Sequence, residues 1–118
     1  MRFQEVTPIS REEALSAFAS NNVEAICDAL IRITYHDPDW HWVQEQCVRF
    51  AEFPDVDVRG LAVTCLGHLA RIHRRLNLEE VLPLLKSLLN DPDVAPRVLD
   101  TLDDIKMFME FSTDLSKP

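Results

Sequence analysis

The sequence predicts an all-α fold: a short right-handed superhelix of about three stacked helical hairpins, or about six helices in total. Apolar residues recur at helical spacing from about residue 10 onward. Turns of the form Asp-x-Asp begin at positions 37, 55 and 91, so the intervals between them match one helix with its turn and one hairpin. The apolar positions repeat at the hairpin-length interval, and a period of this size is typical of stacked helix pairs.

The first helix is expected to start after Ser10. Ser10 and Glu13 have the spacing of a capping box, in which the hydroxyl and the carboxylate each accept a free backbone amide. The polar run at residues 20–22 is expected to end this helix. Residues 1–9 are expected to form an extended arm.

Five further helices follow from the spacing of apolar residues, at about 23–35, 39–52, 57–73, 78–89 and 94–111. The helix at about 57–73 has little polar surface and is expected to be buried on more than one side. Its Gly60, Thr64 and Gly67 form a flat strip, which suggests that a helix of this chain or of a partner approaches closely. The whole of 1–118 is expected to be a single domain, with a flexible tail at 112–118.

One aspartate in each of the three turns is expected to cap the following helix, because a short carboxylate accepts free amides at a helix start. In the third turn Asp93 is the expected cap, since Pro96 then lies in the first helical turn, where no amide is needed. Under this interpretation Arg59 pairs with a turn aspartate. A second interpretation is that the turns bind a cation or a basic partner.

The chain is acidic, with 20 Asp and Glu against 12 Lys and Arg and a net charge of −8. This charge repels nucleic acid and attracts a basic protein. No apolar run is long enough for a membrane span, and the first residues lack the apolar core of a signal peptide. The three cysteines are widely spaced and odd in number, which favours buried thiols in a reducing compartment, so a cytoplasmic location is expected.

Residues 54–92 resemble one unit of a HEAT-repeat protein, a member of the armadillo-like α-solenoids. The matching motifs are Asp55, Val58-Arg59, Pro83-Leu84-Leu85 and Asp91-Pro92. The flanking segments match less well, and Ala95-Pro96-Arg97 stands where Val-Arg is expected. The resemblance implies a small bacterial scaffold for protein or peptide binding, and it implies no catalytic residues.

The sequence predicts neither a metal site nor a cofactor. His36 and His41, like His68 and His73, are five residues apart, which places the members of each pair on different sides of a helix. Neither the spacing of a nucleophile with its base nor a glycine-rich phosphate loop is present. The chain is therefore not expected to be an enzyme.

Two aromatic segments are candidates for partner contact. Trp40 and Trp42 cannot share one helical face, so one ring is expected to be partly exposed as a binding hot spot, with a polar rim of Gln44, Glu45 and Arg49; alternatively both rings pack between helices. The segment 107–111 forms either a self-made cap or a contact surface, through which a dimer is conceivable. The helices at about 39–52 and 78–89 are expected to line the concave face. The expected partner-binding residues are Asp39, Trp40, Trp42, Glu45, Glu79, Glu80, Asp103, Asp104, Phe108 and Phe111.

Three functions are compatible with these features. The first is an acidic adaptor or inhibitor that sequesters a basic protein, and its specific form is an immunity protein against a bacterial toxin. The second is a structural HEAT module of a larger complex or of a homodimer. The third and most remote is a HEAT-like lyase or hydrolase.

Overall fold

The computed structural model describes the backbone of residues 5–115 and the side chains of residues 5–109. Over this range the chain forms six α-helices and no strand, which confirms the predicted fold class. The helices are α1 (Arg11–Ala19), α2 (Val23–His36), α3 (Trp40–Phe50), α4 (Val56–Ile72), α5 (Leu78–Leu88) and α6 (Ala95–Leu115). The expected positions were correct to within a few residues, except that α6 continues beyond the expected end at about residue 111.

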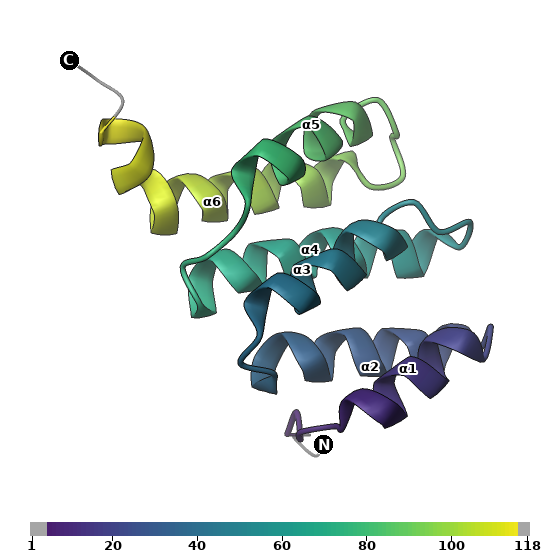
Figure 1. The fold of residues 1–118 in the computed structure, drawn as a ribbon. Coiled ribbons are helices and arrows are strands. Elements are labelled where there is room, and N and C mark those ends of the chain that lie inside the picture. Colours follow the sequence, from purple (N-terminus) through teal and green to yellow (C-terminus); the bar gives the residue numbers. More distant parts are fainter. Residues whose placement is uncertain (1–4, 116–118) are drawn as a thin grey trace.

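The helices pair as α1 with α2, α3 with α4 and α5 with α6, and the three pairs lie one above another (Figure 1). Successive pairs contact each other chiefly through α2, α4 and α6. The HEAT-like unit that the sequence suggested over 54–92 would pair α4 with α5. In the structure, α4 packs mainly on α2, α3 and α6 instead. The left-handed backbone of Arg74, with a φ of 54°, turns the chain away from α4 at this point.

The row formed by α2, α4 and α6 is more closely packed than the row formed by α1, α3 and α5. The expectation that α3 and α5 line a concave face stays a prediction, because these contacts define which helices pack together and not how the stack curves.

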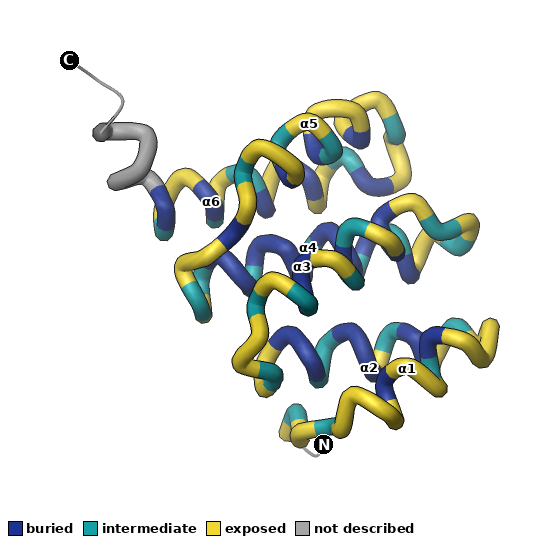
Figure 2. The backbone as a smooth tube through the Cα atoms, viewed as in Figure 1, coloured by how far each residue is buried: buried dark blue, intermediate teal, exposed yellow. Residues whose placement is uncertain are grey.

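Helix α4 lies in the centre of the core. Buried residues lie on several sides of it, including Val58, Val63, Leu66 and Leu69, as the apolar sequence of this helix predicted. Figure 2 shows the same helix as the most continuously buried segment of the stack.

The flat strip on α4 accommodates α6. A β-carbon added to Gly60 would lie 3.0 Å from the Arg97 side chain, and one added to Gly67 would lie 2.8 Å from Oδ2 of Asp104. The Thr101 hydroxyl donates a 2.9 Å hydrogen bond to the Val63 carbonyl oxygen across the same contact. The close approach is thus made by a helix of the same chain, which was one of the two expected alternatives.

The turns contain the predicted caps, with one difference. Ser10 and Glu13 form the capping box. In each Asp-x-Asp turn the first aspartate accepts a hydrogen bond from the amide of the second, over 2.9, 2.8 and 3.0 Å for Asp37, Asp55 and Asp91. In the third turn it is therefore Asp91, and not the expected Asp93, whose carboxylate accepts a backbone amide.

The described part of the N-terminal arm is not helical and is held against α2. Arg32 donates from Nε to the Thr7 carbonyl over 3.0 Å and from Nη2 to the Pro8 carbonyl over 2.7 Å. His36 Nε2 lies 2.6 Å from the Val6 carbonyl oxygen. None of the helices in the described range is long and apolar enough to cross a membrane.

Candidate partner-binding surface

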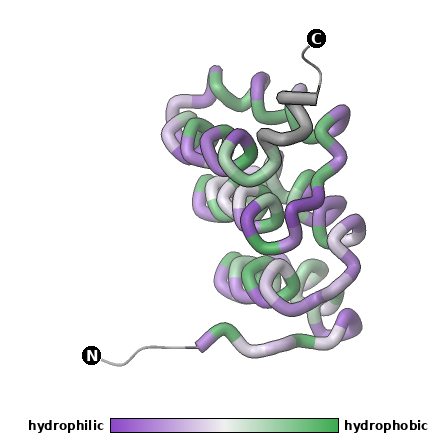
Figure 3. The backbone as a smooth tube through the Cα atoms, turned by 90° about the vertical axis from the view of Figure 1, so that its left-hand side faces the viewer, coloured by the Kyte–Doolittle hydropathy of each residue, from purple (hydrophilic) through white to green (hydrophobic). Residues whose placement is uncertain are grey.

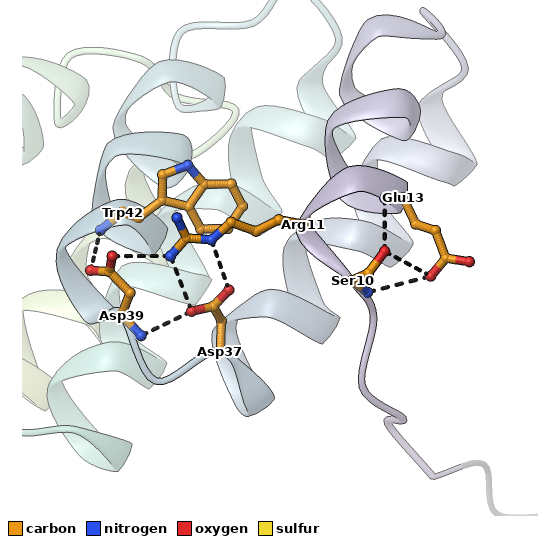
Figure 4. Close-up of polar contacts among 6 residues, drawn as sticks. All are labelled: Ser10, Arg11, Glu13, Asp37, Asp39 and Trp42. Carbon is orange, nitrogen blue, oxygen red and sulfur yellow. Dashed lines mark hydrogen bonds and ion pairs between the residues drawn. The ribbon is translucent and has the colours of Figure 1, made fainter.

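Trp42 is part of a polar cluster between α1 and the turn before α3 (Figure 4). The Arg11 guanidinium lies over the Trp42 ring at 4.2 Å from its centroid. Arg11 Nη2 lies 3.0 Å from Oδ2 of Asp39, and Nε lies 3.4 Å from Oδ2 of Asp37. One face of the Trp42 ring is therefore occupied by a cation of its own chain.

The same cluster fixes the charge of Asp39. The hydrogen bond from Arg11, together with the one that Asp39 accepts from the Trp42 amide, lowers the pKa of this carboxyl below its ordinary value of 3.8. The carboxylates of Asp37 and Asp39 in turn raise the pKa of Arg11. Asp39 therefore acts first as the cap of α3 and as an ion-pair partner, and its exposed carboxylate is negatively charged at neutral pH.

Both tryptophans are half-buried and pack against the core. Trp40 meets the ring of His41 edge-on, with 5.5 Å between the ring centroids. The two alternatives were one partly exposed ring or two packed rings. The structure agrees fully with neither, because both indoles are partly buried and partly exposed.

The acidic residues expected on α3 and α5 differ in their surroundings. Glu45 is exposed and lies 3.8 Å from Nδ1 of His41. Glu79 and Glu80 are both exposed, and the Glu80 carboxylate also accepts a 2.7 Å hydrogen bond from Nε2 of Gln44. Glu80 is therefore committed to the contact between α3 and α5.

Gln44 was expected at a polar rim, and this expectation was wrong. Its side chain is fully buried, and its Oε1 accepts a 2.7 Å hydrogen bond from the amide of Asn77 at the start of α5. Gln44 thus supplies the side-chain partner for a helix start at which Asn77 itself makes no side-chain cap.

The predicted partner-binding residues on α6 differ in how far they are exposed. Asp103 is exposed, whereas Asp104 is half-buried against Gly67. Phe108 is partly buried under the Arg74 guanidinium, at 5.7 Å. The side chain of Phe111 lies outside the described residues.

The neighbouring methionines divide between the two expected alternatives for this segment. Met109 is buried and contributes to the core, whereas Met107 is 67% exposed. The segment is therefore partly self-capped and partly open.

Several surface residues were not anticipated from the sequence. Between α2 and α4, Tyr35 meets His68 edge-on with ring centroids 5.5 Å apart. Burial and the nearby Arg71 lower the pKa of His68, and its Nδ1 is buried without a hydrogen-bond partner. On α6, Leu99 is 56% exposed and Asp100 is exposed beside it. Helical spacing alone could have placed Leu99 opposite the apolar face of α6 and so identified it.

The cysteines are free; Cys47 and Cys65 are buried as predicted, whereas Cys27 is only partly buried. Contact with the Cys65 thiol and burial raise the pKa of Cys47. Within the described residues no group of three His, Cys, Asp or Glu side chains could hold a metal ion. The surface chemistry in this range is that of charged and half-buried aromatic side chains.

These features define a small all-α protein made of stacked helical hairpins. The chain is similar to a chain in the crystal structure of a CDI complex from Cupriavidus taiwanensis LMG 19424, with 39% sequence identity and a TM-score of 0.82. The match covers 92% of this chain and 97% of the other. The protein therefore belongs to the family of that Cupriavidus chain. No family profile and no curated protein matches the sequence.

Proposed function

We propose that this protein acts by binding another protein, as the immunity component of a contact-dependent inhibition pair. The observation that carries the proposal is the 39% identity, over nearly the full length of both chains, to a component of a CDI complex. A chain that shares this much sequence and fold retains its mode of association more readily than a distant structural relative does. The proposal includes a cytoplasmic location, where an incoming toxin would be met.

Charge supports the immunity role over the toxin role. With a net charge of −8, the chain would attract a basic toxin over long distances and accelerate encounter with it. Binding of this kind neutralises the partner by covering it, so the proposal requires no catalytic group in this chain.

The proposed architecture is that of a HEAT-like scaffold. The stack presents long helical faces on a rigid core, and such faces offer an extended area for a protein partner. The buried links between hairpins, such as Thr101 to the Val63 carbonyl, hold these faces in fixed relative positions. Rigid presentation lowers the entropy cost of binding.

A growth assay tests the proposed function. The proposal predicts that a toxin domain is encoded directly upstream of this chain, and this domain would be induced in a susceptible bacterium with and without the chain. The toxin domain alone is expected to arrest growth, and co-expression of the chain is expected to restore it. A chain from an unrelated pair is the control and should not protect. Continued arrest in the presence of soluble, folded chain would overturn the proposal.

A second candidate is a structural module that dimerises through its C-terminal helix. The observation that favours it is the 67% exposure of Met107 near the end of the described part of α6. Sedimentation over a wide range of concentrations distinguishes the two. A concentration-dependent dimer would support this candidate, and a monomer at all concentrations would remove it.

A further inference from the structure

We propose that the toxin component docks on the outer face of α6, with basic side chains over Asp100 and Asp103 and apolar recesses for Leu99 and Met107. This inference rests on the proposed function and specifies which surface performs it. The outer face of α6 is defined here by Pro96, Leu99, Asp100, Asp103, Lys106 and Met107, all of which are exposed.

These six residues lie on one side of the helix. Val98, Ile105 and Met109 are buried on the opposite side, and Thr101 is buried in the contact with α4. Spacings of three and four residues join Leu99, Asp103 and Met107 into one stripe. Helix α6 belongs to the last hairpin of the stack, at the end opposite α1 (Figure 1), so no further hairpin in the described range covers this stripe.

The outer face of α6 exposes large apolar side chains to solvent. Leu99 and Met107, at 56% and 67%, are the two most exposed large apolar side chains of the described residues. They are two helical turns apart, or about 12 Å along the axis. Figure 3 shows hydrophobic and hydrophilic positions interspersed along the helices of the stack. This spacing suits two separate anchor points on either side of a polar centre.

The charges at that centre are not neutralised within the described residues. Asp28, Asp39 and Asp91 each have an arginine partner within 3.2 Å. Asp100 and Asp103 have no ion pair in the described range, and they are three residues apart on the same helical face. Like charges at this spacing repel each other, so a cationic partner would remove a destabilising interaction as well as form new ones.

The occupant is a basic protein and not a second copy of this chain. Two copies packed antiparallel about Asp103 would place Leu99 against Met107, but they would also place the two Asp103 carboxylates against each other. Parallel packing would oppose both Asp100 and Asp103 to their own copies. Each copy also carries a net charge of −8, which opposes close approach.

The test measures the affinity of the full chain for the purified toxin domain encoded directly upstream, in a catalytically inactive form. The test variant is Asp100→Lys with Asp103→Lys, and the control is Glu12→Lys with Glu52→Lys on exposed positions elsewhere. Each pair of substitutions changes the net charge by +4, from −8 to −4, so long-range attraction falls equally. The α6 variant is expected to raise Kd at least about 100-fold and the control less than about tenfold.

Two further readouts keep the inference falsifiable. Circular dichroism checks that each variant is folded. Hydrogen exchange on the unmodified chain is expected to show slower exchange at residues 96–107 on binding, with no change at residues 11–19.

The possible results are distinct. If the unmodified chain binds the toxin domain and the α6 variant binds as tightly as the control, the inference fails while the proposed function stands. If the unmodified chain does not bind, the proposed function fails and the inference falls with it. A dimer of the unmodified chain that the α6 substitutions dissociate would assign this face to a second copy and overturn the inference.

Discussion

Arg59 on α4 lies 3.2 Å, from its Nε to Oδ2, from Asp91 in the turn that precedes α6. The geometry is that of an ion pair, since this Nε makes no hydrogen bond of good angle. Its Nη1 donates to the carbonyls of Phe53 and Pro54 over 3.2 and 2.8 Å. Arg11 on α1 also pairs with Asp37, to which its Nε donates a 3.4 Å hydrogen bond, so two of the three Asp-x-Asp turns pair with an arginine of a preceding helix. This confirms the pairing of Arg59 that the capping interpretation predicted.

Replacing Arg59 should therefore loosen the contact between the second and third hairpins. Arg59→Met is expected to lower the free energy of unfolding by about 2–3 kcal/mol, because two carbonyls lose a charged donor and a carboxylate loses its ion-pair partner, and the Arg59 side chain is only 17% exposed. Urea denaturation would measure the change. The exposed Lys86→Met is the control and should stay within about 0.5 kcal/mol of the unmodified chain.

Replacing either of two glutamines on α3 by methionine should have different effects on stability. Gln44→Met leaves the Asn77 amide and the Glu80 carboxylate without their partner, and we expect a loss of about 1–3 kcal/mol. Gln46 has a buried Oε1 that accepts no hydrogen bond, so Gln46→Met is expected to be neutral or stabilising. Thermal unfolding of the two variants side by side is the measurement. Equal destabilisation would show that Gln44 does not connect α3 to α5.

Replacing the two glycines of α4 by alanine should also have different effects on stability. Both sites gain about 1 kcal/mol of helix propensity from alanine. At Gly60 the new β-carbon meets the flexible end of Arg97, which can move aside. At Gly67 it meets Asp104 and the Thr101 hydroxyl, which is held by its bond to Val63. Gly60→Ala is therefore expected to be neutral or stabilising, and Gly67→Ala to cost about 1–3 kcal/mol. Denaturant midpoints that fall in the reverse order would contradict the described contact between α4 and α6.

The contribution of Arg11 should depend on pH through Asp39. The pKa of Asp39 is lowered in the folded chain, so the associated stability is present above its ordinary value of 3.8 and is lost as the pH falls through the folded value. Arg11→Gln is expected to destabilise the protein at neutral pH and to approach the unmodified chain in acid below 3.8. Unfolding curves over this range would measure the difference. A difference that stays constant down to low pH would show that the ion pair contributes nothing.

The fold was largely predictable because the signals are local. Apolar spacing defined all six helices, and Ser10 with Glu13 marked the first helix start. The pairing of helices was less accessible, because α4 is apolar enough to pack against several neighbours and the sequence does not rank them. The choice was made by long-range contacts such as Thr101 to the Val63 carbonyl.

The candidate surface was only partly predictable. Exposed acids such as Glu79 and Asp103 follow from helical position. The burial of Gln44 and the cover of Arg11 over Trp42 do not, because both depend on residues that are distant in the sequence. A polar residue in a helical pattern is assigned to the solvent side unless the sequence reveals its partner.

The most direct test of the account is isothermal titration of this chain with the purified toxin domain encoded directly upstream, at low and at high salt. We expect a one-to-one complex whose association weakens as the salt concentration rises, because an acidic surface meets a basic one. If the folded chain does not bind this toxin domain at low salt, the result would contradict the proposed function.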